Sequence, residues 1–213
     1  AYHFSGSLFL YNELAKQGLD LHVIRPRDNR INYDDLEAAI TPGTKLVAIS
    51  LVSAFNGFQH DLKKVCDIAH AKNALVFADI IQGAGAVPID VKESDVDFCS
   101  CATYKWLMGD FGQGFLYVRK DKLGLLKRSQ IGYRQEAKFV SHIFPFDDPS
   151  NVLFETESRN DVAGHFEVGT FSNAAIAAVR HSLNYLLTTE VVKIQQYRKP
   201  MMDLQQKKLP ALG

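Results

Sequence analysis

Uninterrupted apolar runs, each about as long as one β-strand, constrain the fold of this chain most strongly. They are KLVAISLV (45–52), ALVFAD (74–79) and DFCSC (97–101), and GFLYVR (114–119) adds a fourth strand. A strand that is apolar at nearly every position has to be covered on both faces. That requirement is met in a parallel sheet that lies between two layers of helices.

A helical pattern separates two of these strands. Asp61 is a suitable N-cap, and the residues after it are apolar at helical intervals. These apolar residues are Leu62, Val65, Cys66, Ile68 and Ala69. The alternation of strands and helices predicts an α/β fold, a three-layer αβα sandwich with a mainly parallel sheet.

Shorter patterns precede the first long strand, and two more segments follow the last one. Residues 7–17 and 34–40 have helical spacing, and LHVI (21–24) predicts a short strand. Residues 141–164 have no clear period and predict a loop with short extended pieces. After Ser172 the apolar spacing returns to that of a helix.

Composition excludes several classes of function. The 213 residues include 24 basic and 24 acidic side chains, so no broad electrostatic field favours nucleic acid or an anionic membrane as a partner. No run approaches the roughly 20 apolar residues that a membrane span needs. The composition thus predicts a globular protein that binds a small molecule.

The three cysteines and the histidines predict neither a disulfide framework nor a metal site. The number of cysteines is odd, and they lack C-x-x-C spacing: Cys66, Cys99 and Cys101. This pattern is typical of reduced, buried thiols, and it favours a cytoplasmic location. Cys99 and Cys101 would face the same side of one strand. His60 follows a turn and is expected in a surface loop; because no H-E-x-x-H-like cluster accompanies it, no metal is predicted.

Two charged residues are placed where chemistry is expected. Asp79 ends a buried strand, and ligands of parallel sheets bind beyond such strand ends. Lys105 lies between Tyr104 and Trp106, where an apolar environment lowers the pKa of an amine and makes it nucleophilic. Taken singly, Asp79 is equally well a helix cap and Lys105 a surface lysine. Together they fit pyridoxal phosphate, which needs a lysine for its aldehyde and a carboxylate for its ring nitrogen.

The order of three motifs resembles a known family. D-x-x-Q (79–82), T-x-K-W (103–106) and G-x-G-F-L-Y-V (112–118) follow one another as in the central part of the class V aminotransferase group of fold-type-I pyridoxal-phosphate enzymes. This group includes cysteine desulfurases, selenocysteine lyases, kynureninase and isopenicillin-N-epimerase-like proteins. A dinucleotide-binding domain is the weaker alternative, because no G-x-G-x-x-G lies between a first strand and its helix.

The resemblance implies a role for each matching residue. Lys105 would form the Schiff base with pyridoxal 5'-phosphate, and Asp79 would pair with the protonated pyridine nitrogen. Gln82 would hydrogen-bond the phenolic oxygen, and Thr103, two residues before the lysine, would donate to the phosphate. Thr170, in the F-E-x-G-T-like segment FEVGT (166–170), would reach the phosphate of a neighbouring subunit, which implies a homodimer.

The resemblance also implies a domain organisation and a reaction class. Residues 1–189 would be the cofactor-binding large domain without its N-terminal part, and residues 190–213 a helix that leads toward a small C-terminal domain. The implied enzyme is an aminotransferase or lyase that acts on an amino acid. Transamination, elimination, desulfuration and epimerisation remain open, as does a truncated, non-catalytic homologue that serves dimerisation or scaffolding.

Overall fold

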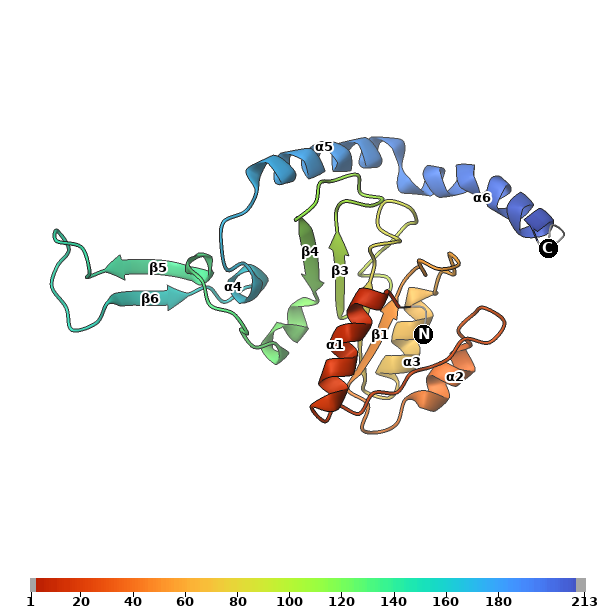
Figure 1. The fold of residues 1–213 in the computed structure, drawn as a ribbon, viewed down its shortest axis with the longest axis horizontal. Helices are drawn as coiled ribbons and strands as arrows, with labels where there is room; N and C mark the ends of the chain where they lie inside the picture. The colour runs from red at the N-terminus through yellow and green to blue at the C-terminus, as the bar shows by residue number, and fades with distance from the viewer. Residues whose placement is uncertain (1–2, 210–213) are drawn as a thin grey trace. The chain divides into compact units, whose positions relative to one another are not determined.

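A four-stranded sheet forms the centre of the larger part of the chain. The computed structural model describes residues 3–209 (Figure 1). The strands are β1 (Leu46–Ser50), β2 (Leu75–Asp79), β3 (Phe98–Ala102) and β4 (Gly114–Val118), and they lie in this order in the sheet. The β1–β2 and β2–β3 pairs are parallel, whereas β4 runs opposite to β3. The predicted α/β fold with a mainly parallel sheet is therefore confirmed.

The chain divides into two compact units. The first contains the residues up to 117 together with those from 173 onward, and the second contains residues 118–172. The helices of the first unit are α1 (Ser5–Lys16), α2 (Tyr33–Ala39), α3 (Leu62–His70), α5 (Asn173–Thr189) and α6 (Val191–Lys208). Glu190, with φ at 65°, separates α5 from α6. The predicted division of the chain at residue 190 remains a prediction.

The core of the first unit lies where helix α3 packs on the sheet. Val65 of α3 and Val76 of β2 are fully buried, and Leu186 brings α5 into the same cluster. Cys99 and Cys101 are both buried, as their two-residue spacing on one strand predicts. The apolar runs of β1, β2 and β3 are thus largely buried strands, which explains why they have no polar alternation. The expectation fails for β4, where only Val118 is buried and Phe115 is 45% exposed.

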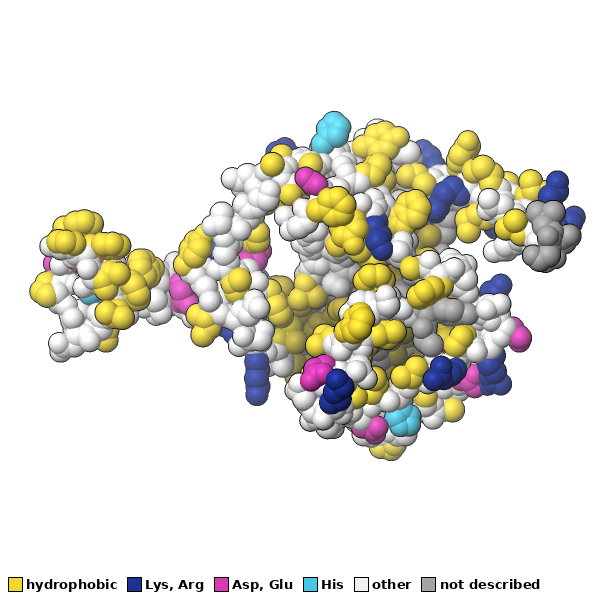
Figure 2. Space-filling model, in the orientation of Figure 1, with side chains coloured by type: hydrophobic (Ala, Val, Ile, Leu, Met, Phe, Trp, Pro, Cys, Tyr) yellow, Lys and Arg dark blue, Asp and Glu magenta, His cyan; other side chains and the backbone are white. Residues whose placement is uncertain are grey.

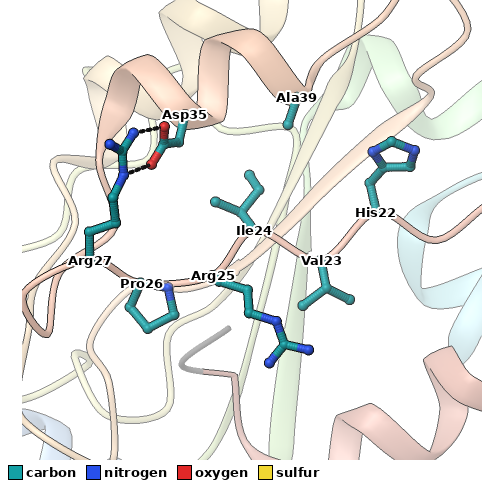
Figure 3. A pocket seen from close by; sticks show the side chains of 8 residues that line it. All are labelled: His22, Val23, Ile24, Arg25, Pro26, Arg27, Asp35 and Ala39. Atoms are coloured by element: carbon teal, nitrogen blue, oxygen red, sulfur yellow. Dashed lines mark hydrogen bonds and ion pairs between the residues drawn. The ribbon is translucent and has the colours of Figure 1, made fainter.

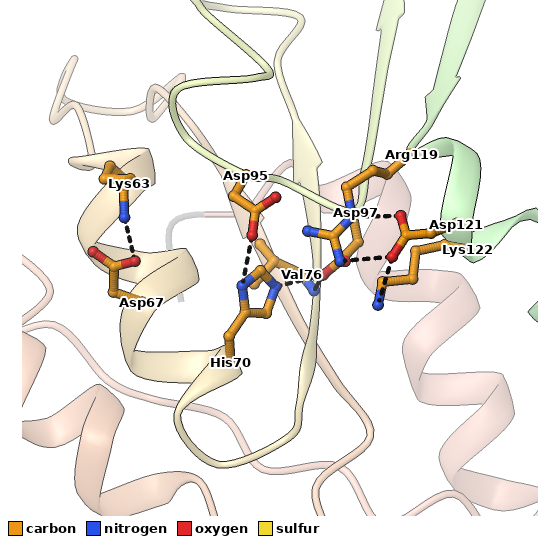
Figure 4. A network of polar contacts seen from close by, with 9 residues as sticks. All are labelled: Lys63, Asp67, His70, Val76, Asp95, Asp97, Arg119, Asp121 and Lys122. Carbon is orange, nitrogen blue, oxygen red and sulfur yellow. Dashed lines mark hydrogen bonds and ion pairs between the residues drawn. The ribbon is translucent and has the colours of Figure 1, made fainter.

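A buried carboxylate fixes the end of α3 against the sheet. Asp97 is completely buried, and its Oδ2 accepts hydrogen bonds from the backbone N–H of Val76 and from His70 Nε2, each at 2.8 Å. Figure 4 shows His70 between Asp97 and Asp95, whose carboxylate lies 3.6 Å from His70 Nδ1. These contacts align β2 with α3 and so help to place the end of β2, where Asp79 lies.

The second unit contains an antiparallel hairpin. Its strands are β5 (Glu136–Ser141) and β6 (Phe154–Ser158), and a short helix, α4 (Val162–Phe166), follows them. Apolar side chains cover the hairpin surface, as Figure 2 shows. The exposed ones include Phe139, Phe144, Phe146, Leu153 and Phe154. Residues 141–164 were predicted to be a loop with short extended pieces. The structure shows the hairpin loop there, followed by the strand β6.

Two local predictions were wrong. Residues 21–24 do not form the predicted strand and lie outside both described sheets. His60 is buried rather than in a surface loop, since its backbone N–H bonds the Leu51 carbonyl. The rings of Phe58 and Tyr33 pack against it edge-on, with centroids 5.0 and 6.5 Å away.

Candidate functional site

The candidate site lies at the carboxyl ends of β2 and β3, which are neighbours in the sheet. Asp79 is the last residue of β2 and pairs in register with Ser100 of β3. Lys105 follows three residues after β3 ends at Ala102. The parallel pairing therefore brings the two predicted catalytic residues to the same edge of the sheet.

Asp79 is held by the turn that follows it. Its Oδ1 accepts a hydrogen bond from the backbone N–H of Ile81 at 3.0 Å, so the carboxylate is oriented at the strand end. Its negative charge raises the pKa of Tyr11, where burial is the larger cause. The alternative that the sequence left open for Asp79, a helix cap, is wrong, because a turn and not a helix follows β2.

Burial and two nearby charges affect the pKa of the Cys101 thiol. Burial is the largest cause that raises the pKa of Cys101 to about 12. The Asp79 carboxylate raises this pKa further, whereas the Lys105 ammonium lowers it.

A direct hydrogen bond joins the loops that carry Gln82 and Lys105. Trp106 Nε1 donates to Gln82 Oε1 at 3.0 Å. Gly85 lies against the same loop with φ at +87°, and a Cβ on Gly85 would approach the Trp106 carbonyl oxygen to 2.3 Å. Only glycine fits there, so the two loops pack closely.

Lys105 is half-buried, and its Nζ lies 5.5 Å from the centre of the Phe4 ring. This cation–π contact keeps the amine over an aromatic surface at the edge of the sheet. Its chain neighbours Tyr104 and Trp106 are 40% and 49% exposed, so the aromatic contact of the amine comes from Phe4 rather than from them.

His3 belongs to the site and was missed at the level of sequence. It is buried, and its Nδ1 lies 3.3 Å from Ser50 Oγ at the end of β1. Burial lowers the pKa of His3, while the nearby Asp79 carboxylate acts in the opposite direction. The Nε2 atom has no hydrogen-bond partner among the described residues. The position of His3 before the first helix carried no motif that would have identified it.

The two threonines have protein partners in this structure. The Thr103 hydroxyl is buried and lies within hydrogen-bond distance of the Asp110 and Gln113 carbonyl oxygens. Thr170 belongs to the second unit, where its hydroxyl bonds that of Tyr133. A phosphate contact of either threonine remains a prediction.

A second hollow lies beside α2 and the extended segment before it. It has a volume of about 390 Å³, and Figure 3 shows the residues that line it. Arg27 and Asp35 form an ion pair at its rim. Because its only carboxylate, Asp35, is already paired with Arg27, this hollow is a weaker candidate than the strand-end site.

Among the described residues, no group of three or more histidine, cysteine, aspartate or glutamate side chains is arranged to hold a metal ion. A search of the same residues also finds no helix with the length and apolar character that a membrane span requires.

Comparison with known families decides the relationship. The family model for class-V aminotransferases matches residues 3–213. The chain belongs to this family. One relative is an uncharacterised aminotransferase, YcbU, of Bacillus subtilis. It is 38% identical to this chain over 126 residues. This match covers 59% of the chain and 34% of the relative.

A probable cysteine desulfurase of Methanothermobacter thermautotrophicus is 26% identical over 191 residues, which cover 89% of this class-V chain and 44% of that protein. Among solved structures, the apo cysteine desulfurase of Thermococcus onnurineus has a TM-score of 0.80 at 24% identity. The match covers 97% of this chain and 48% of the desulfurase chain. The chain therefore spans about half the length of such relatives and has the large-domain fold of fold-type-I enzymes.

The family also indicates the cofactor. A solved variant of the cystine lyase C-DES carries glycine covalently linked to its pyridoxal-phosphate cofactor. Its structure matches this chain with a TM-score of 0.69 at 18% identity. The match covers 91% of this chain and 50% of the C-DES chain. The family and such neighbours indicate pyridoxal phosphate for this chain. The residues present fit this group: the Asp79 carboxylate, the Lys105 amine and the unpartnered Nε2 of buried His3 are placed at one sheet edge by the strand register and by the contacts of His3 and Phe4.

Proposed function

We propose that this chain is the cofactor-binding part of a pyridoxal-phosphate enzyme that acts on an amino acid by transamination or related lyase chemistry. The observation that supports this proposal best is geometric: the parallel strands place Asp79 and Lys105 at one sheet edge, where His3 lies beside Ser50 and Phe4 lies under the Lys105 amine. The site is built on the ends of β2 and β3, which hold it rigidly.

Each residue of the site has a proposed task. Lys105 would hold the cofactor through its amine, and the same amine would take the proton from the substrate α-carbon. Asp79 keeps a proton on the pyridine nitrogen, because a nearby carboxylate stabilises the protonated form. When bound, the cofactor supplies an electron sink for the charge left on the α-carbon.

The aromatic and polar neighbours complete the proposed site. The imidazole of His3 is the proposed ring that faces the cofactor. It is buried beside Ser50, and the Asp79 carboxylate raises its pKa against the larger effect of burial. Thr103 and Thr170 are the proposed phosphate donors, the latter from a neighbouring subunit. Thr103 would have to exchange its bonds to backbone carbonyls for the phosphate. The proposed working unit is therefore a homodimer.

The test is the absorbance of the protein with added pyridoxal phosphate. We expect Lys105→Ala to abolish the band at about 400 nm and the covalent product of borohydride reduction, because it removes the amine that attaches the aldehyde. Lys127→Ala removes an exposed lysine and serves as the control. A retained covalent chromophore in the Lys105 variant would refute the assignment.

A second variant separates cofactor attachment from catalysis. Asp79→Asn keeps the size of the side chain and removes its charge, so the cofactor should still attach. Loss of the proton on the ring nitrogen should then slow α-proton exchange of bound amino acids by on the order of 100-fold or more. If the unaltered protein attaches the cofactor but processes none of the amino acids offered, a non-catalytic scaffold becomes the better description.

A further inference from the structure

Trp106, the residue after Lys105, is 49% exposed, and two side chains contact its indole. Its indole N–H donates to Gln82 Oε1, and the Arg198 guanidinium lies 6.0 Å from the ring centre. Arg198, on α6, also donates to the carbonyl oxygen of Ala86, which follows Gly85 in the neighbouring loop. The position of the indole is therefore fixed by α6 and by the loop after β2.

The direction of this hydrogen bond decides how the Gln82 amide is oriented. An indole nitrogen can only donate, so the carbonyl oxygen of Gln82 faces Trp106. The reversed amide would place its N–H₂ group against the indole N–H and lose the bond. No described residue accepts a hydrogen bond from the Gln82 amide nitrogen, whose two donors face away from the indole.

We propose that Trp106 is a positioning residue that fixes the Gln82 amide so that its N–H₂ group donates to the phenolic oxygen of the cofactor. This inference rests on the proposed function. It assigns Trp106 a task beyond packing, because the indole N–H selects one of the two amide orientations. Trp106 does not touch the reacting atoms in this arrangement and acts only through Gln82.

The proposal has a spectroscopic consequence. A donor to the phenolic oxygen stabilises its anionic form and weakens the internal hydrogen bond from the protonated Schiff-base nitrogen. The pKa of that nitrogen is then lower than it would be without the donor. If the Trp106 N–H is lost, the Gln82 amide can rotate, and the pKa of the Schiff-base nitrogen should rise.

The experiment is a pH titration of the visible absorbance of the full natural protein loaded with pyridoxal phosphate. Trp106→Phe keeps an aromatic ring and removes the N–H group. Site-specific replacement of Trp106 by benzothienylalanine, in which sulfur replaces the N–H at unchanged shape, provides the same test without a packing defect. Gln82→Leu and the double variant Gln82→Leu/Trp106→Phe complete a double-mutant cycle. Tyr197→Phe, at an exposed position of α6, is the control.

We expect either Trp106 replacement to raise the Schiff-base pKa by about half a unit, corresponding to a weakened, partly exposed hydrogen bond. Gln82→Leu should raise it at least as much, and adding Trp106→Phe to Gln82→Leu should change it no further. An unchanged pKa in the benzothienylalanine protein would overturn the proposal, as would equal shifts with and without Gln82. A protein that takes up no cofactor at Lys105 would instead refute the proposed function, and this inference with it.

Discussion

At the scale of single residues, burial keeps His60 neutral. Its pKa is lowered to about 4, mainly because the folded chain removes the imidazole from water. In the unfolded chain the pKa of a histidine is about 6.5. Below pH 6.5 the unfolded chain therefore takes up a proton that the folded chain does not accept until about pH 4.

This difference makes stability depend on pH in a defined window. As the pH falls from 8 to 5, we expect the titration of His60 to lower the free energy of unfolding by roughly 2 kcal/mol. The loss should level off near pH 4, where the folded chain also takes up the proton. Urea unfolding of the protein and of His60→Leu at several pH values measures the effect. The variant should have a shallower pH slope, and an equal slope in both proteins would contradict the assignment.

The sequence predicted some site residues better than others. The positions of Asp79 and Lys105 could be anticipated because Asp79 ends one buried strand and Lys105 follows the next, and the parallel pairing of β2 with β3 brings them to one edge. Their roles in the site stay predictions. His3 could not be predicted, because its burial depends on long-range packing beside Ser50. His60 was misjudged since the adjacent turn favoured exposure, whereas the rings of Phe58 and Tyr33 cover it.

At the scale of elements, α3 shows how far local signals reach. Asp61 is the predicted N-cap, and its Oδ1 accepts from the Lys64 N–H at 3.0 Å. Tyr33 adds a contact that no local pattern predicts, because its hydroxyl accepts from the Asp61 N–H at 2.8 Å. The start of the helix thus follows from the sequence, and its connection to α2 from the fold.

We expect Asp61→Ala to destabilise the protein by about 1 kcal/mol, because the Lys64 N–H loses its acceptor. Asp67→Ala, on the same helix, removes an exposed carboxylate paired with Lys63 and should cost less than about 0.5 kcal/mol. Thermal or urea unfolding of the two variants gives the comparison. Equal losses would show that the cap contributes no more than a surface ion pair.

Strands depend on partners in a way that helices do not. LHVI (21–24) has the composition of a strand, yet it lies outside both described sheets. By contrast, β6 was not resolved as a strand from the sequence, and it forms because β5 lies opposite it. Pairing, which is set by the whole chain, decided both cases.

At the scale of the whole molecule, the predicted homodimer gives Thr170 its role. Thr170 lies in the second unit, at the end of the segment FEVGT. We expect Thr170→Val to weaken binding of pyridoxal phosphate by roughly 10-fold, the effect of one hydrogen bond to a charged group. Titration of the cofactor by absorbance measures the change.

Mixed dimers distinguish a contact within one subunit from a contact between subunits. A dimer with one Lys105→Ala subunit and one Thr170→Val subunit contains one intact site only if the threonine serves its partner's cofactor. Recovery of tight cofactor binding in such mixtures supports the contact between subunits. Absence of recovery in verified mixed dimers places the contact within one chain.

The buried thiols described above have a practical consequence for assigning the reaction. Burial raises the pKa values of Cys66 and Cys101 to about 12 and that of Cys99 to about 11, so these thiols are neutral and poorly nucleophilic at pH 7. Iodoacetamide should leave all three intact in the native protein. If alkylation nevertheless blocks sulfur transfer from cysteine, the modified sulfur atom belongs to a segment outside these residues, and that segment carries the desulfurase chemistry.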